Sequence, residues 1–228
     1  MDSEISSPTV MIASGDAYEL ATLGASLRLN GISIVAEAQS AAIADNLYRY
    51  LVPKVILIDL QFSNSLLLAL MAKFRKINPE LGIVLITACP DLRLLGISEK
   101  EIPHGSQIVL KKSFTDLSLI SLAIAQSLLS VESGEKKVWV NSHGSLLENS
   151  FKSILDDFTD IQIQTFMLLG QGFTNFEIAR VRFVSEKSVE QIVSRIAEHF
   201  QLENDKTHNQ RVLIAGEYFK WTGTSTTY

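Results

Sequence analysis

The first half of the chain alternates between short apolar runs and longer amphipathic segments. The short runs contain almost no polar positions, which is typical of strands buried on both faces of a sheet. Helices between such strands return the chain in the same direction, so the pattern predicts a five-stranded parallel sheet with crossover helices, an α/β fold. The predicted strands lie at residues 10–13, 33–36, 55–58, 83–86 and 108–110. The predicted helices lie at residues 17–30, 41–51, 65–77 and 114–129, the last with Ser113 and Asp116 spaced as a capping box.

From residue 151 onward the pattern is helical only, which predicts a separate all-α domain of four helices. Residues that cap helices precede three of them, and these are Thr159, Thr174 and Ser185. The predicted helices run from 160 to Gly172, over Asn175–Arg182, over 186–200 and over 209–221. The polar stretch between the two patterns lacks helical periodicity and predicts a linker with a short extended piece at Val138–Val140. The predicted domains are therefore 1–130 and 151–228, joined by the linker 131–150.

Composition and charge narrow the class of protein. Hydrophobic residues make up 46% of the chain, which is enough for a packed core, and the net charge is −5 without a long run of either sign. A single cysteine, Cys89, excludes a disulfide framework within the chain and favours a reducing compartment. The polar start "MDSEISSP" is unlike a signal peptide, and the longest apolar run, 66–72, is too short to span a membrane. We expect a cytoplasmic protein that has no membrane partner.

Three polar side chains follow predicted strands at the point where each strand ends. Asp59 closes the third strand, Thr87 closes the fourth, and Lys111 follows the fifth. Because ligands of parallel α/β sheets bind at the carboxyl ends of the strands, we expect these side chains to share one edge. A carboxylate can accept a phosphoryl group there, with the lysine pairing the new charge and the hydroxyl binding a phosphoryl oxygen.

The order "VMIAS", "VILIDL", "VLITA" and "IVLKK" resembles the receiver domain of bacterial response regulators over about residues 9 to 129. The resemblance implies a flavodoxin-like fold, with Asp59 as the phosphorylation site and Thr87 and Lys111 as receiver switch residues. Receivers usually hold Mg²⁺ with two adjacent acids after the first strand, where this chain has Ser14 and Gly15 followed by Asp16. Because Mg²⁺ needs several oxygen ligands, Asp16 with Asp59 forms only a weak magnesium candidate. We therefore favour a degenerate receiver that requires no cofactor over one phosphorylated with Mg²⁺.

The segment "TNFEIARVRFVSEKSVEQIVSRIAEHF" has the spacing of a helix-turn-helix, with two capped helices and a turn at residues 183–185. Together with "LLGQGFTNFEIA" it resembles the LuxR-type DNA-binding domain of NarL/FixJ-type response regulators, over about residues 158 to 218. The resemblance implies a homodimer whose third helix, 186–200, reads DNA. The DNA-binding candidates are the cations of this region, which can form a local positive face, and polar residues near them: Arg180, Arg182, Lys187, Arg195, Asn175, Ser188 and Gln191.

Charge in the same region leaves a second interpretation open. Glu190 stands where the family usually has a lysine, and residues 151–228 carry 8 Lys/Arg against 10 Asp/Glu, a net charge of −2. DNA affinity rests largely on phosphate neutralisation, so these features favour a protein-interaction adaptor that keeps both folds without DNA binding or phosphorylation. The first interpretation is a DNA-binding transcriptional regulator of a two-component system, with DNA, a second copy, and a sensor kinase or another protein as partners. No P-loop, G-x-G-x-x-G or Ser/His/Asp arrangement is present, so we do not expect an enzyme.

Overall fold

The computed structural model describes residues 7–61, 64–111, 117–134, 138–140, 155–202 and 207–223. The chain divides into two compact units. The first unit comprises Met1–Thr87 and Glu99–Ser150, and the second comprises Ala88–Ser98 and Phe151–Tyr228. In this division Ala88–Ser98 separates from its neighbours along the chain and joins the second unit, and the predicted linker 131–150 falls within the first unit.

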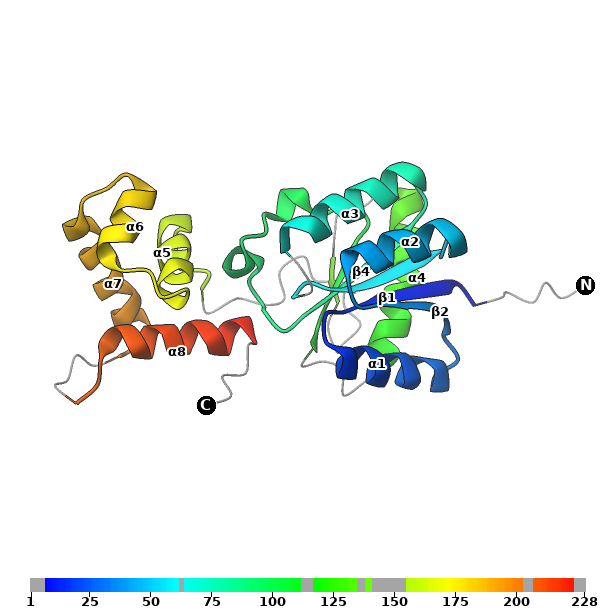
Figure 1. The fold of residues 1–228 in the computed structure, drawn as a ribbon, viewed down its shortest axis with the longest axis horizontal. Coiled ribbons are helices and arrows are strands. Elements are labelled where there is room, and N and C mark those ends of the chain that lie inside the picture. Colours follow the sequence, from blue (N-terminus) through cyan, green and yellow to red (C-terminus); the bar gives the residue numbers. More distant parts are fainter. Residues whose placement is uncertain are drawn as a thin grey trace, which may run out of the picture. The chain divides into compact units, whose positions relative to one another are not determined.

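The first unit is a parallel sheet with the strand order β2-β1-β3-β4-β5-β6. Helices α1 and α4 pack on one face of this sheet, and α2 and α3 lie on the other face (Figure 1). The strands are β1 (Thr9–Ala13), β2 (Ser33–Ala38), β3 (Val55–Asp59), β4 (Gly82–Thr87), β5 (Gln107–Leu110) and β6 (Val138–Val140). The helices are α1 (Ala17–Leu29), α2 (Ala41–Leu51), α3 (Asn64–Ile77) and α4 (Ser118–Ser133), with the short 3₁₀ helices η1 (Leu92–Leu95) and η2 (Glu99–Glu101) between β4 and β5.

The apolar runs form buried strands because both of their faces are covered. Every residue of β3, β4 and β5 is buried, which explains why these strands contain almost no polar positions. Alternate side chains of the sheet join the apolar side of α1 and α4 in a single core cluster. On the other face Tyr48 of α2 stacks on Phe74 of α3 with 4.0 Å between the ring centroids.

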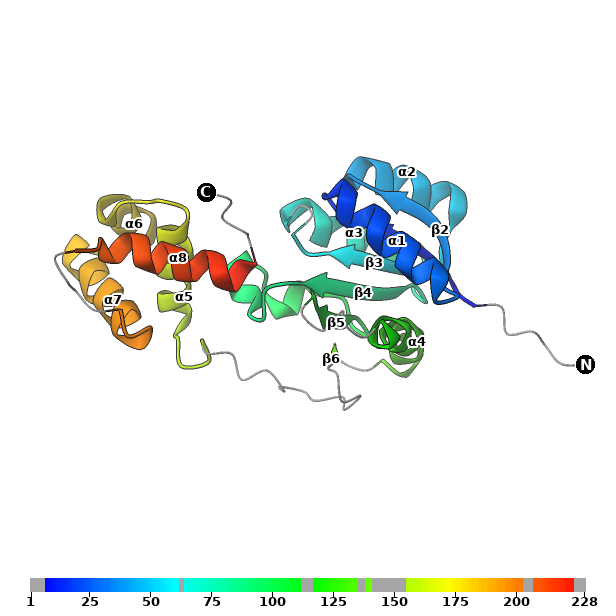
Figure 2. The same ribbon diagram turned by 90° about the horizontal axis from the view of Figure 1, so that it is seen from below.

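The sheet in the described residues has six strands, one more than the five predicted. The sixth, β6, is the short extended piece predicted at Val138–Val140 within the linker, and it pairs in parallel with β5, as Figure 2 shows. Val140 is 2% exposed and belongs to the core cluster, so burial of this side chain holds the short strand against the sheet. Helix α4 also runs past the predicted end at 129, and Gly134 ends it at a positive φ of 68°. The predicted capping box at Ser113 and Asp116 lies outside the described residues, as do 135–137 and 141–150 of the predicted linker.

The second unit contains the four predicted helices, α5 (Asp160–Gly170), α6 (Asn175–Arg182), α7 (Glu186–His199) and α8 (Gln210–Thr222). Thr159, Thr174 and Ser185 cap the first three of these helices, and each side chain accepts a hydrogen bond from a backbone N–H of the first turn. Phe166, Ile178, Val189 and Ile214 come from the four helices and meet in one core. Among the described helices of both units, none has the length and apolarity required to cross a bilayer.

Candidate functional site at the Asp59 edge and on helix α7

Asp59 ends strand β3 and is buried, with 3% of its surface exposed. In the sheet register it lies opposite Ile86 of β4, one residue before Thr87. One carboxylate oxygen, Oδ1, accepts a hydrogen bond of 3.0 Å from the backbone N–H of Gln61. A buried carboxylate needs a compensating charge as well, because removal from water penalises its ionised form.

Lys111 supplies that charge. It follows β5, and its Nζ lies 2.9 Å from Asp59 Oδ2 and 2.8 Å from Glu19 Oε1. Nζ also donates to Gln61 Oε1 at 3.3 Å. Burial lowers the pKa of Lys111, but the hydrogen bonds to Glu19 and Asp59 and the negative charges of these two residues outweigh burial and raise it. The edge thus holds a positively charged ammonium between two carboxylates.

Thr87 lies at the same carboxyl end of the sheet. It is fully buried at the end of β4, and it is paired in the register with Leu110, the residue before Lys111. The structure therefore brings together the three strand ends that carry Asp59, Thr87 and Lys111, as the sequence predicted.

Glu19 belongs to this site and was missed in the sequence. It lies in the first turn of α1, and its Oε2 accepts a hydrogen bond of 3.3 Å from Ser14 Oγ. The available signal was its spacing from Asp16, since an acid three residues after a helix N-cap lies over the first turn. Because α1 begins just after β1, that turn stands at the carboxyl end of the sheet.

Asp16 does not join the group around Lys111. It is exposed and caps α1, with its Oδ1 accepting a 2.8 Å hydrogen bond from the backbone N–H of Glu19. The carboxylates of Asp59 and Glu19 are the acids that face the edge, and both are paired with the Lys111 ammonium. The described part of the chain contains no group of three His, Cys, Asp or Glu residues that could hold a metal. Both carboxylates of the edge are paired with Lys111, which therefore competes with Mg²⁺ for the same oxygens.

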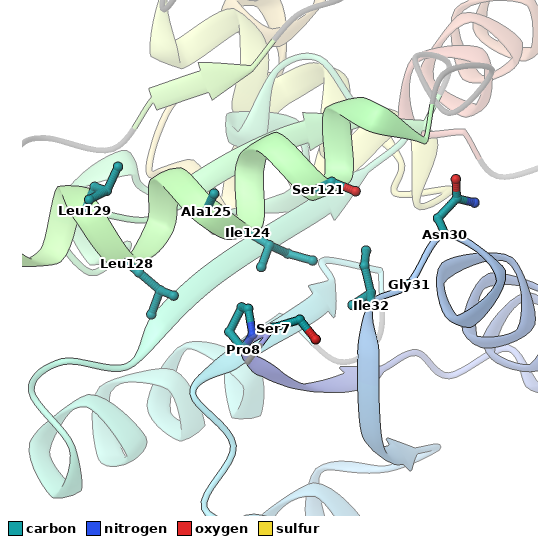
Figure 3. Close-up of a pocket in the computed structure, with 10 residues that line it drawn as sticks. All are labelled: Ser7, Pro8, Asn30, Gly31, Ile32, Ser121, Ile124, Ala125, Leu128 and Leu129. Carbon is teal, nitrogen blue, oxygen red and sulfur yellow. The ribbon is translucent and has the colours of Figure 1, made fainter. Parts of the chain in front are cut away.

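A cavity of about 450 Å³ lies in the first unit, away from this edge (Figure 3). Its lining is mainly apolar, with Ile32, Ile124 and Leu128 around it and Ser7, Asn30 and Ser121 as its polar side chains. Pro8 and Ile32 directly precede β1 and β2, so the cavity stands at the amino ends of the strands. It contains none of the residues that surround Asp59.

The second candidate site is the helix-turn-helix formed by α6 and α7. Phe183 ends α6 in the left-handed region with φ 55°, and Ser185 caps α7 two residues later. Ser188 takes part in this cap, because its backbone N–H and its hydroxyl both lie within hydrogen-bond distance of Ser185 Oγ. The apolar side of α7 packs against α6 through Ile178, Ala179, Val189, Val193 and Ile196, and its opposite side faces solvent.

Lys187, Gln191 and Arg195 lie on the exposed side of α7 at intervals of four residues, so they form one ridge along the helix. None of the three side chains makes a hydrogen bond or an ion pair to another described residue. Glu190 is also exposed and lies beside this ridge.

Three other predicted DNA-binding residues are engaged within the unit. Asn175 Oδ1 accepts a hydrogen bond from Arg211 Nη1, and Arg180 forms an ion pair of 2.8 Å with Glu177. Arg182 Nη1 donates to the hydroxyl of the fully buried Thr165 at 2.8 Å. Lys187, Gln191 and Arg195 are thus the predicted residues whose side chains have no such contact in the described structure.

Comparison with known proteins finds no matching family model and no matching curated protein sequence. A solved complex of the two-component response regulator RcsB with DNA matches 94% of this chain and 98% of its own chain, with 20% identity and a TM-score of 0.52. RcsB of Salmonella enterica serovar Typhimurium bound to the promoter rprA has 18% identity over 92% of this chain and 97% of its own, with a TM-score of 0.46. A LuxR-family response regulator of Aurantimonas sp. matches 58% of this chain and 89% of its own, with 20% identity and a TM-score of 0.47. At this level of identity the comparison concerns the fold, and the chain has the two-domain fold of the response regulator in the first of these structures.

Proposed function

We propose that this protein is a DNA-binding transcriptional regulator of the response-regulator type, whose receiver-like unit works without Mg²⁺-dependent phosphorylation. The observation that carries the proposal is the exposed ridge of Lys187, Gln191 and Arg195 on a helix held by the turn of a helix-turn-helix. The whole-chain likeness to the fold of RcsB, solved as a complex with DNA, supports it.

The chemistry of the ridge suits a duplex. Lys187 and Arg195 can neutralise phosphates on either side of a groove, and the amide of Gln191 between them can pair with a base edge. The capped N-terminus of α7 adds a partial positive charge at the end where Lys187 lies. Glu190 beside the ridge repels phosphate, so we expect the affinity of one domain to be low, and binding as a homodimer over two half-sites compensates for this.

The group at the Asp59 edge supports regulation without phosphorylation. A phosphoryl donor carries negative charge toward Asp59, and that charge must be neutralised during transfer. Lys111 is divided between Asp59 and Glu19, so both carboxylates of the edge already have a cation as partner. Incubation of the full-length protein with acetyl phosphate and Mg²⁺, followed by intact-mass measurement, should show no added phosphoryl group. A modified species that disappears in Asp59→Asn would overturn this part of the proposal.

DNA binding is tested on the full-length protein with labelled fragments of the source genome at several salt concentrations. We expect retardation at low salt and an affinity that falls as salt rises, because bound phosphates release counterions. Lys187→Ala should weaken binding and reduce the slope of log K against log salt by about 0.9. Lys220→Ala is the matched control, since Lys220 lies on α8 of the same unit and pairs with Glu217. Equal losses of DNA affinity in the two variants would show that α7 is not part of the DNA interface.

The second candidate function is a protein-interaction adaptor. Two features favour it: Asn175 and Arg182 are engaged inside the unit, and α6 with its turn exposes Phe176 (60%) and Phe183 (96%). Exposed aromatic side chains of this kind are enriched at protein interfaces. Absence of any retarded complex at low salt, for the full-length protein on genomic fragments, would favour the adaptor over the transcription regulator.

A further inference from the structure

The connection between β4 and β5 contains a segment that belongs to the other unit. Ala88–Ser98 follows Thr87 directly, yet it clusters with the helices of the second unit, and the chain returns to the first unit at Glu99. The segment contains η1, and helix α5 of the second unit packs against η1. The helices that begin at residue 151 are therefore not the whole of the second unit, because eleven residues from the middle of the chain complete it.

Apolar side chains place this segment in the core of the second unit. Cys89 and Leu94 are fully buried, and both belong to the cluster that contains Phe158 and Phe166 of the helical region. Leu95 packs against the same cluster. Such a contact removes apolar surface of the helices from water, so loss of the segment would expose part of their core.

Arg93 fixes the segment to the start of α5 by polar contacts. Its Nη2 donates to the carbonyl oxygen of Leu155 at 3.0 Å, and its Nη1 donates to the carbonyl oxygen of Phe158 at 3.1 Å. Nη1 also lies 3.3 Å from Asp160 Oδ1 in the first turn of α5. One guanidinium thus joins three points of the chain that leads into α5, and an arginine is suited to this because its donors form a rigid fork.

The segment is held in the shape that makes these contacts. Asp91 is 8% exposed, pairs with Arg93 at 2.7 Å and accepts the backbone N–H of Arg93 at 3.0 Å. The hydrogen bond to Asp91 and the charge of Asp91 raise the pKa of Arg93, so the guanidinium keeps its charge. Gly96 ends η1 with φ 69°, and the hydroxyl of Tyr218 in α8 donates to the Leu94 carbonyl oxygen at 3.4 Å. A preorganised segment loses less conformational freedom when it binds.

We propose that Ala88–Ser98 is an intrachain ligand of the second unit, packed against α5 and α8, and that it couples the Asp59 edge to the packing of these helices. The segment leaves the sheet at Thr87, the buried residue beside Asp59 and Lys111 at the carboxyl end of the strands. A change at that edge which moves the end of β4 would therefore move Cys89 and Leu94 in the other core. The coupling concerns the protein's own packing, so it does not depend on whether the second unit binds DNA.

The first test is hydrogen exchange, followed by mass spectrometry, on the full-length protein without DNA. Leu94→Ala and Arg93→Ala should accelerate the exchange of α5 and α8 amides about tenfold or more, because local opening becomes easier when core contacts are removed. Peptides from β1 to β3 should keep their protection. The matched controls are Leu29→Ala, at a leucine that is 88% exposed, and Arg49→Ala, at a surface pair with Asp45. Unchanged exchange in α5 and α8, or equal acceleration in both units, would overturn the proposal.

The second test is a double-mutant cycle between the edge and the segment. Lys111→Ala should change the exchange of α5 and α8 amides severalfold, and this effect should be lost when Leu94→Ala is already present, because coupled sites are not additive. Additive effects, or no effect of Lys111→Ala on α5 and α8, would overturn the coupling. Neither result would bear on the DNA-binding proposal, which fails on the separate test of duplex retardation.

Discussion

The Asp59 edge of the first unit and the outer face of α7 in the second unit both carry charged side chains, but they use them in opposite ways. At the edge, Lys111 lies between Asp59 and Glu19 and its charge is satisfied within the protein. On α7, Lys187 and Arg195 are exposed and make no ion pair within the described structure. Charge that is already paired holds a fold in place, whereas charge left to solvent is available to a partner. This difference supports the proposal that α7 binds the partner.

Removing the ammonium at the edge should have the largest effect on stability. Lys111→Met leaves the buried Asp59 carboxylate without its partner, and we expect it to lower the free energy of unfolding of the first unit by about 3 kcal/mol. Lys73→Met is the control, because Lys73 pairs with Asp45 at the surface and should cost about 0.5 kcal/mol. Both losses are measured by urea unfolding followed by the fluorescence of Trp139. Every variant also carries Trp221→Phe, so that the signal comes from the first unit alone. Similar losses would mean that the edge is an ordinary surface pair.

Alkaline pH should disrupt the ion pairs of Lys111 with Asp59 and Glu19 in the unmodified protein. Because the pKa of Lys111 is raised above its usual 10.5 in the folded state, its stabilising effect is complete below that value. The effect is then lost as the pH rises through the raised pKa. We expect the difference in stability between the unmodified protein and Lys111→Met to be constant at neutral pH and to shrink above pH 10.5. A difference that persisted in strong alkali would show that the charge of Lys111 is not what stabilises the edge.

An internal polar contact of the second unit provides the next test. Thr165 is fully buried, accepts from Arg182 and donates to the Ile161 carbonyl oxygen at 2.8 Å. Thr165→Val keeps the shape but removes both contacts, so we expect a loss of about 1.5 kcal/mol in the unfolding of the second unit. Trp221 fluorescence in a Trp139→Phe background reports this unit. Ser194→Ala on the exposed side of α7 is the control and should change stability by less than about 0.5 kcal/mol.

Phe183 allows a stabilising change at the turn between α6 and α7. Its φ of 55° is unfavourable for a side chain with a Cβ, and 96% of its surface is exposed. Phe183→Gly should therefore stabilise the second unit by about 0.5–1 kcal/mol, since little burial is lost. Phe176→Gly is the contrasting variant, because the same change inside α6 should destabilise by a similar amount. If both variants changed the stability of the second unit in the same direction, the left-handed conformation of Phe183 would be contradicted.

The smallest effect on stability should come from the ridge itself. Lys187→Ala and Arg195→Ala remove charges that support nothing inside the protein, so each should change the unfolding free energy by less than about 0.5 kcal/mol. Thermal unfolding of the second unit measures this directly. A large loss in either variant would mean that the ridge is part of the fold, and the contrast with the Asp59 edge would not hold.

Local signals in the sequence were sufficient for most of the fold. Buried strands produced runs such as "VILID", and Thr159, Thr174 and Ser185 marked helix starts that the structure confirms. The parts that were missed depend on contacts between distant residues. Val138–Val140 was predicted as an extended piece, but its pairing with β5 as a sixth strand was not, and Ala88–Ser98 joins the second unit through residues more than fifty positions away.

The candidate sites show the same contrast between residues that local signals predict and residues placed by contacts with distant parts of the chain. Asp59, Thr87 and Lys111 were predicted because strand ends of a parallel sheet meet at one edge. Glu19 was missed because it reaches that edge from a helix. Arg182 was predicted to contact DNA from its charge alone, and spacing could not reveal that Thr165, seventeen residues earlier, holds it.

We propose that DNA binding by this protein does not depend on phosphorylation of Asp59. It is tested most directly by the affinity of the full-length protein for its genomic target, measured with and without acetyl phosphate and Mg²⁺, beside Asp59→Asn treated in the same way. We predict that the treatment changes the affinity of the unmodified protein by less than about twofold, a free-energy change near 0.4 kcal/mol. A tenfold rise in affinity on treatment that is absent in Asp59→Asn would show that phosphorylation of Asp59 controls DNA binding.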